Sequence, residues 1–181
     1  MFMHVNAKKT AVAGLLMALA VVLIVLSGIL DFNTLFFLAA AAFLIGIIIK
    51  EYGIKYGAAF FAGCTILGFL LAPQKLYVLT YAMMGVYVLG VEGLWQLLGK
   101  QPEWKKRKLL FTAGKFLIFN VMYIPVLVLF PKLLFAGEVP NSMMLVFLLA
   151  GQVALFLYDK AYEYFLISMW SSIRERIFGK N

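Results

Sequence analysis

The sequence predicts an all-α membrane protein, a six-helix transmembrane bundle with both termini in the cytoplasm and a C-terminal amphipathic helical extension. Three observations predict it. First, 65% of the 181 residues are hydrophobic, 13% are charged and the mean hydropathy is +0.98, whereas soluble domains carry about 25% charged residues. Second, long uncharged runs match the roughly 20 residues that a helix needs to cross a bilayer. Third, the basic residues gather in alternate loops.

Six segments have the length and composition of membrane-spanning helices. A span must be a helix or part of a closed barrel, and none of these segments alternates as a barrel strand does. We expect helices at approximately residues 10–30, 32–49, 56–72, 76–98, 109–135 and 142–173. The fifth segment contains Lys115, whose ammonium we expect to reach the interface along its aliphatic stem. After Tyr158 the apolar residues keep to one side of the helix, which predicts the amphipathic extension.

The distribution of basic residues predicts the orientation of these helices. With six spans, 13 of the 16 Lys and Arg residues lie on the side of the N-terminus, Lys75 and Lys132 lie opposite, and Lys115 is inside a helix. Basic loops stay in the cytoplasm. We therefore expect a multi-pass protein of the cell membrane, a bacterial plasma membrane, with both termini cytoplasmic. Short connections predict a single transmembrane domain over residues 1–181, and the basic run 104–108 is expected to contact anionic lipid.

The composition excludes the familiar enzyme constellations. A single cysteine, Cys64, and a single histidine, His4, cannot supply a disulfide, a His-based metal site or a His-dependent triad. No HExxH, GxSxG or glycine-rich phosphate loop is present. We expect no enzyme, no cofactor and no metal, and the chain is too apolar to offer a basic face to nucleic acid.

Small and polar residues inside the spans are the candidates for function. Ala11, Gly14 and Ala18 follow one side of the first helix, where small residues allow close helix contact; this is either internal packing or a partner-binding face. Asn120 and Gln152 must point at other helices or at a cavity. Together with neighbouring tyrosines they either line a pocket or join helices by hydrogen bonds.

Two further features bear on a pocket. Pro125 interrupts the hydrogen bonds of the fifth helix, and such breaks either mark ligand sites in transporters or are passive kinks. The segments 31–34, 73–75 and 131–141 lie on the predicted outer side. They are candidates for a lid over the pocket.

The first helix carries a resemblance to a known family. The run KKTAVAGLLMALA at residues 8–20 resembles the opening of the substrate-binding S-components of energy-coupling factor (ECF) transporters, with Gly14 where those proteins more often have Ala. The length, the six helices and the small extramembrane mass agree with that family. The run LAPQK at residues 71–75 and the helix after it are similar to uncharacterised S-component-like membrane proteins.

The resemblance implies a subunit of an ABC importer that captures a small vitamin-like solute from the outer side. A transmembrane coupling protein and cytoplasmic ATPases would be its partners, and the first helix, with Ala11, Gly14 and Ala18, would meet the coupling protein. The family's pocket lies between the later helices and the outer loops. The residues expected to bind substrate are Asn33, Tyr77, Tyr81, Tyr87, Asn120, Tyr123 and Gln152.

The alternative is a non-catalytic scaffold, a morphogenesis membrane protein of the rod-shape-determinant type. It would have a similar size and helix count and would act through helix contacts without a ligand cavity.

Overall fold

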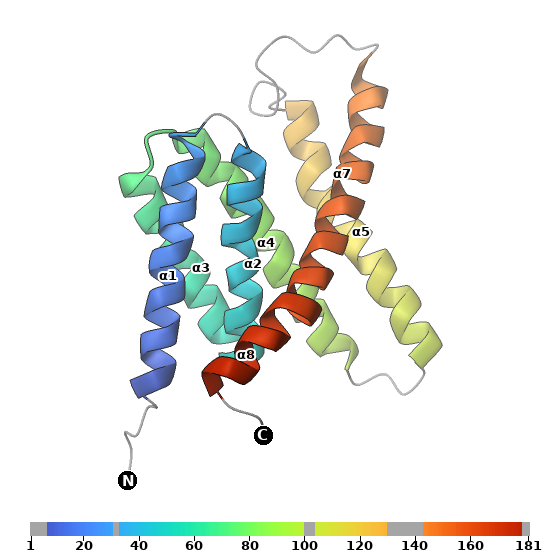
Figure 1. The fold of residues 1–181 in the computed structure, drawn as a ribbon. Helices are drawn as coiled ribbons and strands as arrows, with labels where there is room; N and C mark the ends of the chain where they lie inside the picture. Colours follow the sequence, from blue (N-terminus) through green and yellow to red (C-terminus); the bar gives the residue numbers. More distant parts are fainter. Residues whose placement is uncertain (1–6, 31–32, 100–103, 130–142, 179–181) are drawn as a thin grey trace. The chain divides into compact units, whose positions relative to one another are not determined.

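The computed structural model describes residues 7–30, 33–99, 104–129 and 143–178. Throughout these ranges the regular elements are helical: α1 (Ala7–Ser27), α2 (Thr34–Tyr52), α3 (Ile54–Leu71), α4 (Lys75–Leu98), α5 (Trp104–Leu129), α7 (Met144–Tyr164), the π-helix η2 (Phe165–Trp170) and α8 (Ser171–Phe178) (Figure 1). Six helices are long and apolar enough to cross a membrane, and the last runs from Met144 to Arg174. The predicted all-α architecture with six apolar helices is confirmed.

The helix boundaries differ from the expected ones mainly in the second half of the chain. Helix α5 begins at Trp104, five residues before the predicted start. Its predicted end at residue 135, and the candidate lid 131–141, lie outside the described residues. The last helix continues through η2 and α8 to Phe178 without a break, so the C-terminal extension prolongs this helix. Its 31-residue apolar part is about 46 Å long, more than the roughly 30 Å of hydrocarbon.

The chain forms two compact units, residues 1–92 and 93–181. Unit 1 contains α1, α2, α3 and most of α4, and unit 2 contains the end of α4 with α5, α7, η2 and α8. Each unit is described by itself.

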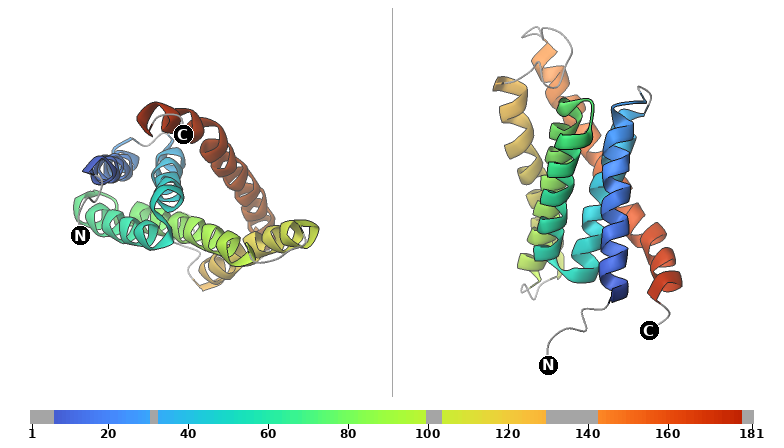
Figure 2. Two further views of the ribbon diagram at one scale, coloured as in Figure 1. Left: turned by 90° about the horizontal axis from the view of Figure 1, so that it is seen from below. Right: turned by 90° about the vertical axis from the view of Figure 1, so that its left-hand side faces the viewer.

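Helices α1, α2 and α3 pack side by side in unit 1, with α2 the most deeply buried (Figures 1 and 2). Every side chain from Ala41 to Ile49 is buried. The turn between α2 and α3 is one residue, Gly53, whose φ of 93° favours glycine. A Cβ on Gly57, one turn further on, would lie 2.2 Å from Ile49, so glycine at this position lets α3 fold back tightly against α2.

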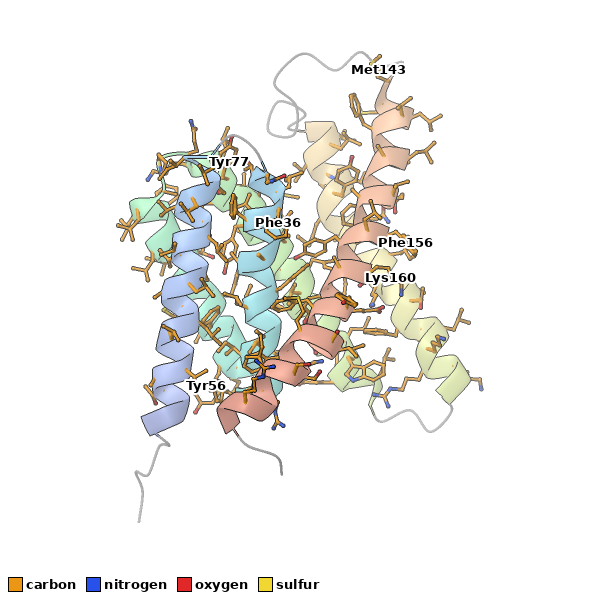
Figure 3. All side chains as sticks on the ribbon, viewed as in Figure 1. Phe36, Tyr56, Tyr77, Met143, Phe156 and Lys160 are labelled. Atoms are coloured by element: carbon orange, nitrogen blue, oxygen red, sulfur yellow. The ribbon has the colours of Figure 1, made fainter. Side chains whose placement is uncertain are left out.

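The two turns at the other end of unit 1 are joined by direct contacts. A Cβ on Gly28, at the end of α1, would lie 3.0 Å from Pro73 in the α3–α4 turn. Lys75 donates hydrogen bonds to the carbonyls of Ala72, at 2.9 Å, and of Phe69. Its ammonium therefore caps the C-terminal end of α3, where the helix dipole is negative. Tyr77 lies at this end of the unit, and Tyr56 lies at the opposite end (Figure 3).

Unit 2 is built on the antiparallel pair α5 and α7, and the end of α4 packs on α5. A Cβ on Gly114 would lie 2.2 Å from the Leu94 side chain, which fixes how closely α4 approaches α5. Beside this contact, the rings of Trp95 and Phe111 meet edge to face at 4.9 Å.

Candidate functional site

Polar side chains join α5 to α7 at three successive levels, which we call the polar seam. The antiparallel arrangement brings residues that are distant in sequence opposite one another. The seam consists of Lys115, Asn120 and Tyr123 on α5 and of Phe147 (through its carbonyl), Gln152, Asp159 and Glu163 on α7.

The middle level is a reciprocal amide pair. Asn120 Nδ2 donates to Gln152 Oε1 at 3.2 Å, and Gln152 Nε2 donates to Asn120 Oδ1 at 2.8 Å. Asn120 Nδ2 also donates to the Phe116 carbonyl at 2.8 Å. The structure thus brings together two residues predicted to bind substrate, and it places them against each other. Paired in this way, the amides escape the cost of exposure to lipid.

Tyr123 forms the level on one side of the amide pair. Its hydroxyl donates to the Phe147 carbonyl at 2.7 Å, and its ring stacks on Phe119 with centroids 5.0 Å apart. A Cβ on Gly151 would lie 2.4 Å from the Tyr123 ring. The phenol therefore lies in a close fit against α7, and its hydroxyl has a backbone partner.

The level on the other side of the amide pair is an ion network around Lys115. Its ammonium lies 2.8 Å from Asp159 and 2.7 Å from Glu163, and the Lys115 side chain is only 8% exposed. Glu163 also binds Lys160 at 2.7 Å through its other oxygen. Two cations and two anions therefore balance one another.

The Lys115 ammonium binds α7 and does not extend along its own helix. Because α5 begins at Trp104, Lys115 is about three turns inside the helix, and its ammonium donates to Asp159 and Glu163. That the ammonium lies at the membrane interface stays a prediction.

Aromatic rings extend this network toward the start of α5. The Lys115 ammonium lies 4.5 Å from the Phe111 ring centroid, Phe111 meets Trp95, and the Arg107 guanidinium lies 3.9 Å from the Trp95 ring. Cations favour the faces of aromatic rings. Cation and ring alternate along one face of α5, which ties the end of α4 to the polar seam.

Asp159 and Glu163 were not among the predicted site residues. The signal for them was Lys115 itself, since a cation in an otherwise apolar span requires a counter-ion. The two acidic residues lie four positions apart in the second half of the last predicted span, so they share a helix face. An antiparallel fifth and last helix would have brought them together.

The remaining predicted substrate-binding residues lie in unit 1. Tyr81 and Tyr87 are buried on α4, and the Tyr81 ring lies 6.0 Å from that of Phe61. Tyr77 is half-buried, and Asn33 is exposed with a left-handed φ of 64° at the start of α2. Asn120, Tyr123 and Gln152 belong to unit 2, so the structure describes two separate groups, and a common pocket stays a prediction.

The predicted partner-binding residues share an exposed face of α1. Ala11, Gly14 and Ala18 are all exposed, and a Cβ on Gly14 would meet nothing within 4 Å. Glycines elsewhere in unit 1 are in contact: a Cβ on Gly63 would lie 3.0 Å from Met17, and one on Gly68 would lie 3.2 Å from Ile24. Gly63 and Gly68 of α3 therefore serve internal packing against α1. The small residues of α1 lie on an exposed side of the helix instead.

The chemistry of these groups is that of contact between helices. Across the described ranges, no three His, Cys, Asp or Glu residues cluster as a metal site would require. The seam joins α5 to α7, and the small residues Ala11, Gly14 and Ala18 of α1 are exposed.

Comparison with protein families, with curated proteins and with solved structures finds no match to this chain.

Proposed function

We propose that the protein is the membrane-embedded substrate-binding subunit of an ECF-type ABC importer. It captures a small vitamin-like solute from the outer side and docks onto a transmembrane coupling protein that cytoplasmic ATPases drive. Docking uses the face of α1 formed by Ala11, Gly14 and Ala18, and both termini lie in the cytoplasm. The observation that supports the proposal is the exposure of all three small residues on one helix face.

The physical argument rests on what drives helix association in lipid. Apolar side chains gain little there by leaving the solvent, so contact depends on close backbone approach and good packing. Small residues such as Ala11, Gly14 and Ala18 allow that approach. Nothing lies within 4 Å of a Cβ on Gly14, so this position has room for a helix from another protein.

The test is a double substitution on this face with a matched control. G14L/A18L places two large side chains on α1, and A58L/A62L does the same at two exposed small residues four positions apart on α3. Each tagged protein is purified from the membranes of its own host. We expect wild type and A58L/A62L to retain a coupling protein and ATPase subunits with Walker motifs, and G14L/A18L to lose both.

Solute capture is measured separately on the same preparations by native mass spectrometry. G14L/A18L should carry the same bound small molecule as wild type, because α1 is altered only on its outer face. Retention of the ATPase subunits by G14L/A18L would contradict the docking face. Absence of ATPase subunits and of a small molecule from wild type would contradict the importer.

The polar seam favours a second function, the non-catalytic scaffold of the rod-shape-determinant type. Asn120, Gln152 and Tyr123 have hydrogen-bond partners within unit 2, as expected for groups that join helices. A scaffold would also use the α1 face, but its partner would carry no ATPase and no small molecule would accompany it. The two functions therefore differ in the outcome of the same purification.

A further inference from the structure

The last helical rod changes its hydrogen-bond pattern immediately after the polar seam. Ion pairs tie α7 to α5 as far as Glu163, and the π-helix η2 begins two residues later at Phe165. After η2, the rod returns to α-helical bonding as α8. Figure 1 shows α7 and α8 as parts of one continuous rod.

A π-helix bonds each N–H to the carbonyl five residues earlier, and single π turns within α-helices arise where the chain holds one extra residue. Adding or removing one residue per turn rotates everything beyond it by about 100°, because an α-helix has 3.6 residues per turn. In the six-residue π segment Phe165–Trp170, a change in backbone hydrogen bonds can therefore rotate α8 relative to α7.

Serine hydroxyls bond to the backbone where the π pattern ends. Ser171 donates to the carbonyls of Ile167 and Ser168, and Ser172 donates to Ser168 at 3.0 Å. Serine hydroxyls that bond to carbonyls three and four residues earlier compete with the backbone bonds of the helix and often accompany a bend. They therefore mark this point as one where the α-helical bonding of the rod is weakened.

The side chains of the last helix make different contacts on the two sides of η2. On α7, Asp159 and Glu163 are held by Lys115, and the amide pair holds Gln152. On α8, the described side chains are exposed, Arg174 and Arg176 among them. Within η2, Leu166 and Trp170 are buried and lie on one face; a change in bonding pattern would turn that face.

We propose that η2 is a rotational joint, at which α8 changes its orientation while α7 stays fixed to α5 by the polar seam. The joint exchanges between π and α bonding, and α8 turns with each exchange. The proposal does not depend on the solute or on the partner, and it applies to an importer subunit and to a scaffold alike.

The test compares two spin-labelled pairs with the same spacing in full-length protein reconstituted into lipid nanodiscs. The pair L157C/I173C spans η2, and L145C/A161C lies within α7; both pairs are sixteen residues apart at exposed positions, or about 24 Å. Both carry C64A, which removes the single native cysteine. Pulsed electron–electron double resonance measures the distance distribution of each spin-labelled pair.

We expect L157C/I173C to give two distances, or a distribution at least twice as wide as that of L145C/A161C. Deleting Ser168 removes the extra residue, and the distribution of L157C/I173C should then narrow to the width of the α7 pair. An equally narrow distribution for both wild-type pairs would overturn the joint. So would an unchanged broad distribution after the deletion, because the breadth would then come from fraying of α8.

Discussion

Asn120 and Gln152 bond each other in both directions across α5 and α7, at 3.2 Å and 2.8 Å. Each amide offers one acceptor and two donor hydrogens, and the pair matches one acceptor with one donor on each side. Such a pair holds the two helices in one register, because a shift of one helix by one residue would break both hydrogen bonds. Both hydrogens of the Asn120 amide are used, so a solute that accepts a hydrogen bond from Asn120 must replace a bond that already exists.

Replacing both amides should cost less than the sum of the two single replacements. In N120L or Q152L the remaining amide has lost its partner in an apolar environment, and we expect unfolding free energies lower by about 1–3 kcal/mol. N120L/Q152L should be more stable than the sum of the single effects predicts, by about 0.6–1.7 kcal/mol. Equilibrium unfolding in mixed micelles measures this coupling, and strict additivity would show that the amides do not act as a pair.

The sequence could predict that these two amides point inward, but not that they meet. Hydropathy locates helices because lipid imposes one length and one backbone solution on every span. Which residues face each other depends on the rotation and register of the helices. From the sequence alone, several helices could equally well face each amide. The open face of α1 was predictable as a row of small residues. That its residues are exposed, while Gly63 and Gly68 of α3 contact α1, is visible only in the structure.

The ion network illustrates the same limit. Lys115 and the two acidic residues are 44 and 48 positions apart, so no local pattern connects them. Its distance from the predicted helix end suggested an interfacial lysine, and the structure adds two carboxylates to which its ammonium is bound. A charge within an apolar span is expected to have such a partner.

The lysines of the network should differ sharply in their contribution to stability. K115M leaves Asp159 and Glu163 without their shared buried cation, and we expect the unfolding free energy to fall by about 3–5 kcal/mol. K160M removes a lysine with a side chain 58% exposed, three residues from Glu163. We expect a loss of about 0.5 kcal/mol or less there.

Thermal unfolding in the same detergent measures both lysine variants. Equal losses in K115M and K160M would contradict the burial of Lys115. In that case K115M/D159N/E163Q would be no more stable than K115M, whereas we expect it to recover part of the loss because the carboxylates no longer carry charge.

Two glycines provide a second matched comparison. The Cβ of G151A would lie 2.4 Å from the Tyr123 ring, which its hydrogen bond to Phe147 and its stacking on Phe119 hold in place. We expect G151A to destabilise unit 2 by about 1–3 kcal/mol. G14A should leave stability unchanged or raise it by up to about 1 kcal/mol, since alanine favours helices and nothing surrounds this position.

The Tyr123 ring can be tested as the cause. In a Y123L background, G151A should cost less than it does in wild type, because the ring that it would strike is absent. Residues in direct contact show such non-additive effects. An undiminished cost in that background would assign the effect to another neighbour of Gly151.

The predicted orientation yields the last prediction. In a C64A background, Q74C lies in the α3–α4 turn and K108C lies near the start of α5, both at exposed positions. The excess of basic residues predicts that the first lies outside and the second in the cytoplasm. A membrane-impermeant maleimide added to intact cells should therefore label Q74C and leave K108C unlabelled. In permeabilised cells it should label both cysteines. Labelling of K108C alone in intact cells would invert the topology and contradict the outer-side capture of a solute. The packing inside each unit and the polar seam would stand unchanged.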